Sequence, residues 1–595
     1  MKRRILIQSL ALVACLLCSL NGMARVAAYA IYTSEDSTLT FYYDDNERGH
    51  GVYPCYMNYN DSEPDWHLYG YHNNIVRVVF DPSFVDARPT TTSKWFMDMY
   101  KLRTIEGLEY LNTSQSTSML SMFYNCYKLE SIDLSHFNTA RVKNMAGMFY
   151  RCYKLTSLDV SSFNTGNVEN MNGMFLSCNA LTSIDVSNFD MSKVQKMSAM
   201  FGSCESLTTL DVSNFNTVSA LDMSHLFGFC RHLRTINLGN LDTSNATNIG
   251  YMFYCCDRLQ SIDVSHFDTS NATKMDYMFS QCLSLTSLDV SNFNTENVTT
   301  MYGMFYHSDR LTSLDLSNFN TSNVVNMARM FWLCTGLTDL DISNFDTGNV
   351  KRMDDMFSQC TGLTSLDLSH FNTPNLTNME FMFNGCTGLT ELNVSSFNTA
   401  KVDTMHCVFS GCRSLQSLDV SNFNTGNVVT MESMFSGCSG LTSLDLSSFN
   451  TENVRYISSI FNSCSNLVTI TVGDGWDISH VTNGTFYSDN MFKGCTSLVG
   501  CMGTTFNPSK VGKEYAHIDG GPSNPGYLSA VVMPGDVDGD GEVSIADVTL
   551  LIDYLLSGQS ASINLVNADM DGDGSVSIAD VTFLIDYILL NGSNQ

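Results

Sequence analysis

The chain has 595 residues, more than one hydrophobic core usually supports, so several domains or a repeat array are expected. Its 31 Lys and Arg residues face 60 Asp and Glu residues, which gives a formal net charge of -29. This charge opposes attraction to a phosphate backbone and argues against nucleic acid as a partner.

The N-terminus has the pattern of an export signal. Basic residues at positions 2–4 precede an apolar run over residues 5–20, which is short for a membrane span. We expect a signal peptide over residues 1–24, cleaved near Ala24 or Ala28. Lipid attachment at Cys15 is the alternative, disfavoured because the apolar run continues past it. The protein is therefore expected to be secreted or held at the outer cell surface, with no transmembrane segment in the mature chain.

Residues 25–95 are predicted to form a β-rich N-terminal cap. Apolar and polar residues alternate over 38–42 and 76–80, which is the spacing of half-buried strands. A repeat array needs such a cap to cover the end of its core.

A repeat of 26 residues dominates the next segment, 96–505. It is marked by phenylalanines at 123, 149, 175, 201, 227, 253, 279, 305, 331, 357, 383, 409, 435 and 461. A fixed period of this length predicts a solenoid in which each coil buries its apolar side chains against its neighbours.

Within one coil, two kinds of spacing predict an α/β solenoid. Val142, Met145 and Met148 recur at the spacing of one helical face, which predicts a helical turn. Thr139 and Thr165 precede two such turns and are candidate caps. The segment 155–160 alternates inward and outward residues, which predicts one short strand per coil in a continuous parallel sheet.

Cysteine follows the same period. The ladder occupies 126, 152, 178, 204, 230, 256, 282, 334, 360, 386, 412, 438 and 464, with Ser308 in the one gap. An odd number of cysteines in register cannot all pair, so we expect mostly free, buried thiols that pack as small apolar groups.

The repeat Cys-x-x-Leu-x-x-Leu-Asp-Val-Ser-x-Phe-Asn-Thr-x-Asn-Val-x-x-Met-x-x-Met-Phe resembles that of BspA-type leucine-rich-repeat surface proteins. The resemblance implies a leucine-rich-repeat solenoid on a bacterial surface. For some members of that family it also implies adhesion to host matrix proteins or to other cells.

An aspartate stripe recurs on the outward side of the expected strands. We consider Asp289, Asp315, Asp341 and Asp367 as a possible ligand face, because like charges about 5 Å apart repel unless something offsets them. Hydrogen bonds from neighbouring Ser residues and backbone amides are one explanation. Binding of cations or of a basic partner is the other.

The segment 506–532 contains a run of Gly, Pro, Ser and Asn residues and is predicted to be a linker. Residues 533–595 then repeat an EF-hand-like calcium loop twice, with Asp in place of Glu at position 12. The expected ligand positions are Asp536, Asp538, Asp540, Glu542, Ser544 and Asp547 in the first loop, and Asp569, Asp571, Asp573, Ser575, Ser577 and Asp580 in the second. Two Ca²⁺ ions are therefore predicted.

This module resembles a type I dockerin, a small α-helical module that docks onto cohesin domains. In that family, loop positions 10 and 11 help to select the partner. The resemblance carries this role onto Ile545 and Ala546 in the first copy and Ile578 and Ala579 in the second. Because the two pairs agree, the surface is expected to be usable in either of two orientations.

No catalytic motif accompanies these binding features. The sequence lacks a His-Glu-x-x-His motif, a Gly-x-Ser-x-Gly elbow and a phosphate-binding glycine loop. We therefore expect a non-enzymatic adhesin-like protein whose solenoid binds a host matrix protein, a cell-surface ligand or a glycan. The alternative is a non-catalytic subunit of a dockerin–cohesin complex in polysaccharide catabolism, and a third role is a calcium-stabilised C-terminal cap.

Overall fold

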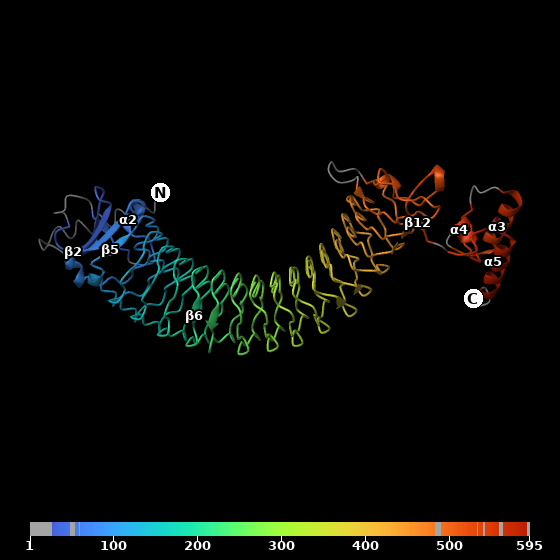
Figure 1. Ribbon diagram of the computed structural model, residues 1–595. Helices are drawn as coiled ribbons and strands as arrows, with labels where there is room; N and C mark the ends of the chain where they lie inside the picture. The colour runs from blue at the N-terminus through green and yellow to red at the C-terminus, as the bar shows by residue number, and fades with distance from the viewer. Residues whose placement is uncertain are drawn as a thin grey trace, which may run out of the picture.

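The computed structural model describes residues 26–47, 54–58, 60–481, 490–531, 533–539, 542–558 and 563–591. These residues form a curved solenoid with a β-sheet domain at one end and a small helical module beyond the other (Figure 1). The expected signal peptide, the alternative lipid site at Cys15 and the expected ligand Asp540 lie outside the described residues.

A five-stranded sheet caps the N-terminal end, in the order β3-β1-β2-β4-β5. Its strands and flanking helical turns are β1 (Ala27–Thr33), β2 (Thr38–Asp44), β3 (Cys55–Tyr56), α2 (Asp65–Leu68), η1 (Tyr71–Asn73), β4 (Arg77–Phe80), η2 (Pro82–Asp86), β5 (Thr104–Glu106) and η3 (Leu108–Tyr110). β1 and β2 are antiparallel, whereas β2, β4 and β5 are parallel. The sheet thus extends past residue 95, and Phe96 stacks on Phe123 of the first coil with ring centroids 5.2 Å apart.

One side of each coil is a ladder of turns bonded to the next coil. The amides of Met145, Gly147 and Phe149 donate to carbonyl oxygens of the following coil at 2.8 to 2.9 Å. Between these bonds, turns close within the coil, as from Met148 N to Met145 O at 3.2 Å. Parallel bridges with a 26-residue register continue along this side from Ser118 to Tyr456.

The helical turn expected near residues 142–149 is therefore wrong. An α-helix is about 10 Å wide and bonds its amides internally, whereas strand-like neighbours stack about 5 Å apart. Positive φ at Gly147 (59°) and Arg151 (58°) interrupts any helical path. Thr139 is likewise no helix cap: its hydroxyl donates to Asn164 O at 2.9 Å and accepts from Asn164 N at 2.7 Å.

The opposite side of the coils carries the expected strands, but the expected continuous sheet is only partly present. Among the described residues, regular pairing occurs at β6 (Thr209–Asp211) with β7 (Thr235–Asn237), β8 (Ser365–Asp367) with β9 (Glu391–Asn393), and β10 (Ser443–Leu446) with β11 (Thr469–Val472) and β12 (Ser529–Ala530). Elsewhere contacts are looser, as from Thr156 N to Glu130 O at 3.4 Å.

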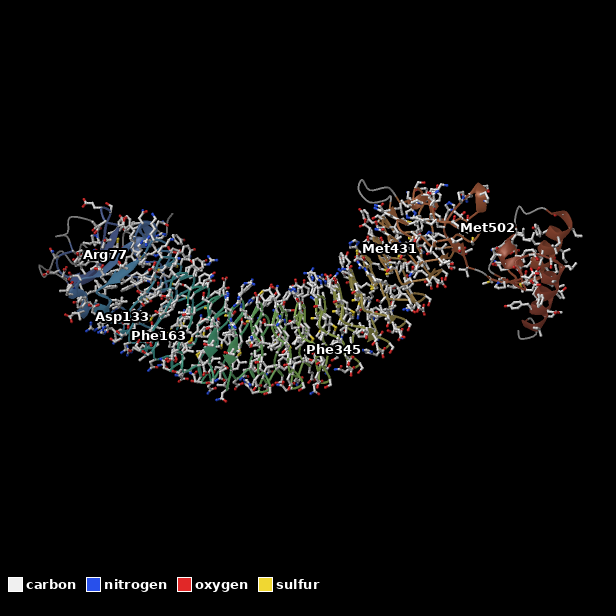
Figure 2. All side chains as sticks on the ribbon, in the orientation of Figure 1. Arg77, Asp133, Phe163, Phe345, Met431 and Met502 are labelled. Carbon is white, nitrogen blue, oxygen red and sulfur yellow. The ribbon has the colours of Figure 1, made fainter. Side chains whose placement is uncertain are left out.

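The two sides of the coils differ in how closely neighbouring coils are bonded, and this difference explains the curvature of the solenoid. Figure 1 places β6 on the convex side, and Figure 2 places Asp133 and Phe345 toward the same side, with Met431 toward the concave side. The tightly bonded turn ladder therefore lies inside the arc, and the strand segments lie outside, where neighbouring coils diverge.

Phenylalanine and cysteine ladders fill the space between the two sides. The rings of Phe149 and Phe175 stack with centroids 5.8 Å apart and planes within 4°. The Cys230 thiol donates to Phe201 O at 3.2 Å, and burial raises its pKa to about 12, which keeps it protonated. Ser308 makes the equivalent bond to Phe279 O at 2.8 Å. The described cysteines are free, as predicted for the ladder.

The segment expected to be a linker, 506–532, is instead largely folded onto the last coil. It contains η5 (Lys513–Tyr515), η6 (Gly521–Ser523) and β12, which pairs in parallel with β11. Tyr527 and Leu528 are fully buried in the solenoid core. The buried carboxylate of Asp519 orders the glycine-rich turns by accepting from the amides of Thr504 at 2.9 Å and Gly521 at 3.0 Å. This segment is the C-terminal cap.

The final module folds around a core of its own. It consists of α3 (Ile545–Ser557), α4 (Leu565–Ala568) and α5 (Ile578–Asn591). Its buried residues are Val537, Leu551, Ala568, Val581 and Leu584. Among the described residues, no helix has the length and apolarity needed to cross a membrane.

Candidate calcium centre and docking surface

The first acidic loop brings together three carboxylates, those of Asp536, Asp538 and Asp547, with oxygens within 4.8 Å of one another. Asp547 is fully buried at the start of α3. Its Oδ1 accepts from Val537 N at 2.6 Å and Asp538 N at 3.0 Å, and its Oδ2 accepts from Ser544 N at 2.8 Å. Position 12 therefore ties the loop to the helix that follows it.

Ser544, at loop position 9, is the N-cap of α3. Its hydroxyl accepts from Ala546 N at 3.1 Å, while Asp547 reaches back to the Ser544 amide, which completes a capping box. The same residues thus serve the loop and the helix start. Glu542, at position 7, is exposed in the same loop, where a backbone carbonyl is the expected ligand.

The second loop brings together Asp569, Asp571 and Asp573 within the same 4.8 Å limit. Asp580 again accepts from backbone amides, those of Met570 at 2.7 Å and Ser577 at 2.7 Å. Burial by itself would raise the pKa of the Asp580 carboxyl, but these amide bonds outweigh it and lower the pKa overall.

The serines of the second loop take supporting positions. Ser575 Oγ donates to Asp573 Oδ1 at 2.7 Å, and Ser577 Oγ accepts from Ala579 N at 3.1 Å. The two loops are thus alike in how position 12 is held. Among the described residues, which do not include Asp540 at position 5 of the first loop, the close carboxylate cluster includes position 12 in the first loop and position 5 in the second.

This donor set fits a hard divalent cation. The cluster atoms are all carboxylate oxygens, which are the ligands that Ca²⁺ prefers. Residues 533–595 contain ten Asp and one Glu with no Lys or Arg, a formal charge of -11. Bound cations would reduce the repulsion among these groups.

The expected partner-selecting residues lie at the first turns of α3 and α5. Ile545 and Ile578 are 74% and 79% exposed, Ala546 is exposed and Ala579 is half-buried. Sequence reasoning missed the rest of this surface. Ile552 and Leu556 extend it along α3 at the i+7 and i+11 positions, and Ile585 and Leu589 do the same along α5.

We call these two sets, Ile545–Ile552–Leu556 and Ile578–Ile585–Leu589, the apolar stripes. The helical spacing from each exposed Ile, together with the inward direction of Leu551 and Leu584, could have revealed them from sequence. Exposed apolar residues gathered in this way are typical of a contact surface.

The aspartate stripe lies on the convex side. Its four members named above are exposed, and each Oδ1 accepts from the amide of the serine two residues on, at 2.9 to 3.0 Å. These serine hydrogen bonds hold the pKa of all four carboxyls below the usual value. Local hydrogen bonds of the expected kind are thus present, and binding of cations or of a basic partner by this stripe stays a prediction.

Comparison with known families agrees with both parts of this structure. The model described as "Mycoplasma protein of unknown function, DUF285" matches residues 90–209, 177–287, 221–332, 309–412 and 389–504. The chain belongs to the DUF285 family, the BspA-like repeat family. A type I dockerin domain follows the DUF285 repeats and matches residues 534–589.

Among solved structures, a leucine-rich repeat protein from Bacteroides ovatus is 16% identical, with a TM-score of 0.39 over 76% of this chain and 95% of that one. One from Eubacterium ventriosum is 16% identical, with a TM-score of 0.33 over 62% and 95%. The functional domain of InlJ from Listeria monocytogenes, which includes a cysteine ladder, is 18% identical, with a TM-score of 0.21 over 62% and 64%. No curated protein matches the DUF285 chain.

Proposed function

We propose that this protein is a secreted or surface-held bacterial binding protein without enzymatic activity. Its DUF285 solenoid acts as a binding scaffold, and its calcium-loaded dockerin docks onto a cohesin-type partner. One observation carries the proposal: the dockerin duplicates an acidic loop, a capped helix and an exposed apolar stripe around a core of its own.

Each loop has the groups to hold one Ca²⁺ ion, with Asp536, Asp538 and Asp547 in the first and Asp569, Asp571 and Asp573 in the second. When bound, the ion supplies positive charge that draws the loop carboxylates together. The position-12 aspartates orient the helices through their amide bonds, and so present Ile545 and Ile578 at the start of each stripe. Two equivalent stripes support docking in either of two orientations.

A role for the dockerin as a mere solenoid cap is less well supported. Residues 506–531 already cover the last coil, with Tyr527 and Leu528 buried in the solenoid core. The dockerin is therefore not needed to shield that core. Its exposed stripes instead favour a contact with another protein.

A binding role fits the solenoid better than catalysis does. Catalysis needs a particular set of perturbed groups in a pocket, whereas this chain repeats one coil many times. An adhesin that grips host or bacterial macromolecules is the first form of the proposal. A non-catalytic subunit of a polysaccharide-degrading complex is the second, and the dockerin favours it.

Surface plasmon resonance tests the docking half of the proposal, with immobilised type I cohesin domains and the full chain as analyte. Binding to at least one cohesin should occur in calcium and be lost in chelator. Replacing either Ile545-Ala546 or Ile578-Ala579 with Asp-Asp should leave binding, and replacing both should abolish it. Val566→Asp on α4, exposed in the same module but off the stripes, is the control. Calcium-independent binding, or binding that survives the double replacement, would contradict the proposal.

A further inference from the structure

On the concave side of the solenoid, the side chains at equivalent repeat positions differ from coil to coil, whereas on the convex side they are nearly the same in every coil. Outward positions on the strands repeat Asp and Ser in coil after coil. On the concave ladder, the repeat position that Gly147 occupies in its coil is occupied in later coils by His225, Tyr251, Tyr277 and Arg329. A surface that changes along the array can form a specific site, which an identical repeat cannot.

Aromatic side chains gather at the middle of this ladder. We call them the aromatic band; its members are half-buried and are His225, Tyr251, Tyr254, Tyr277, Tyr302, Tyr306 and Trp332. Their rings contact one another across the coils, with centroids 4.3 Å apart for His225 and Tyr251 and 5.0 Å for Tyr251 and Tyr277. Tyr306 stacks on Trp332 at 4.7 Å.

The band continues from ring to ring without a break. Tyr277 meets Tyr302 edge-on at 4.9 Å and approaches Tyr306 at 6.2 Å. The Arg329 guanidinium lies over Trp332, 4.9 Å from its ring centroid. Burial, the largest cause, raises the pKa of Tyr254 to about 12, so its hydroxyl remains a neutral hydrogen-bonding group. Rings and hydroxyls therefore form one continuous platform.

Several charged side chains beside the band lie in pairs of opposite sign, whereas the Asp276 carboxylate accepts hydrogen bonds from the Thr300 hydroxyl and from the Tyr302 amide. Arg329 pairs with Asp355 at 3.2 Å, and Arg352 pairs with Asp354 at 2.8 Å. At the other end of the band, Arg231 pairs with Asp257 at 3.0 Å. Although the whole chain is strongly acidic, these pairs reduce the net charge beside the platform. A neutral ligand fits it better than a cationic or an anionic one.

A trough opens on the same concave ladder in the preceding coils. It has a volume of about 290 Å³ and is lined by Tyr124, Tyr150 and Leu176 together with small residues such as Gly147 and Gly173. This volume is near the lower end of the range for small-ligand pockets. The trough gives a chain-like ligand a second point of contact toward the N-terminal end of the array.

We propose that the aromatic band binds a neutral polysaccharide, with the trough extending the site. Neighbouring rings of the band stack on one another and Arg329 lies over Trp332, so the band offers ring edges and hydroxyls to the C–H groups and hydroxyls of sugar rings. The paired charges beside the band favour a neutral ligand over an ionic one. The proposal deepens the scaffold role of the solenoid proposed above, but it does not require the dockerin.

Affinity electrophoresis of the full chain tests this proposal. Native gels would contain hydroxyethyl cellulose, galactomannan or yeast mannan as neutral polymers, and polygalacturonate as the acidic one. We expect retardation by at least one neutral polymer, in calcium and in chelator alike. The double variant Tyr277→Ala/Trp332→Ala should bind that polymer about tenfold or more weakly. Tyr277→Phe/Trp332→Phe, which keeps the rings, should remain retarded.

Tyr69→Ala, at an exposed tyrosine of the N-terminal cap, is the control and should bind as the parent does. Thermal unfolding of each variant identifies any loss of fold. The proposal is overturned if no neutral polymer retards the chain, or if the alanine variant binds unchanged. A further gel contains poly-L-lysine as the cationic polymer. The proposal is also overturned if poly-L-lysine is the polymer bound and Asp354→Asn/Asp355→Asn abolishes that binding. Because cohesin docking needs calcium and this binding does not, either proposal can fail alone.

Discussion

Phe305 is the most direct test of how the solenoid is held together. Its ring is fully buried and stacks between Phe279 at 6.2 Å and Phe331 at 5.8 Å. A buried Phe covers roughly 150 to 200 Å² of apolar surface, so Phe305→Ala, which keeps only the Cβ atom, should cost at most about 4 to 5 kcal/mol at ~25 cal/mol per Å². This agrees with the roughly 3 to 5 kcal/mol typical of Phe→Ala in a core. Because each coil contacts only its neighbours, the loss should be greatest in the two adjoining coils.

Hydrogen exchange measured by mass spectrometry can resolve this locally. The amides of Phe279 and Phe305 donate to the following coils at 2.9 and 3.0 Å, and should exchange faster in the variant. Urea unfolding should show a lower midpoint for at least part of the array. Phe305→Leu is the matched control and should cost less, because it retains most of the apolar contact. If Phe305→Ala unfolds and exchanges as the parent does, the stacked-ring core is wrong.

Three further predictions concern the cysteines, the C-terminal cap and the dockerin. Cys334→Ser should destabilise the protein by about 1 kcal/mol or less, because Ser308 already makes the same hydrogen bond one coil earlier. The number of reactive thiols should be low in the native protein and high after denaturation, and quantitative disulfide bonding would refute the prediction of free, buried thiols. Burial acts to raise the pKa of the Asp519 carboxyl, but the amide and hydroxyl hydrogen bonds that it accepts hold the pKa below its usual value. The ionised carboxylate therefore stabilises the C-terminal cap fully above the unfolded pKa of about 3.9, and this stabilisation is lost as the pH falls through the lower folded value. Proteolysis within 506–531 should accordingly increase below about pH 4 in the parent, and a parent as resistant there as at neutral pH would contradict this assignment. Calcium at a hundredfold excess over Kd should stabilise the dockerin by about 2.7 kcal/mol, so chelation should speed exchange in 533–591 and leave the solenoid unchanged; calorimetry that detects no calcium binding would contradict it.

The sequence by itself determined the repeat, its buried ladders and the acidic loops. A period of 26 residues places Phe123 and its equivalents at the same point of every coil, and only burial against identical neighbours explains such regularity. The spacing of Asp536, Asp538 and Asp547 likewise specifies a turn of oxygen ligands before any coordinates are known. These features depend on local spacing, which the sequence contains in full.

Tertiary structure alone decided which side of the coil is concave, and with it where the varied surface lies. The spacing of Val142, Met145 and Met148 fits a helical face, but the bonds that Met145 and Phe149 make to the next coil replace a helix with turns. Thr139 bonds to Asn164 across coils for the same reason. Asp519 shows the same limit at the C-terminal cap: its partners lie as far away as Met502, 17 residues back. Hydrogen bonds between distant residues determined these outcomes, and the spacing within one segment does not encode them.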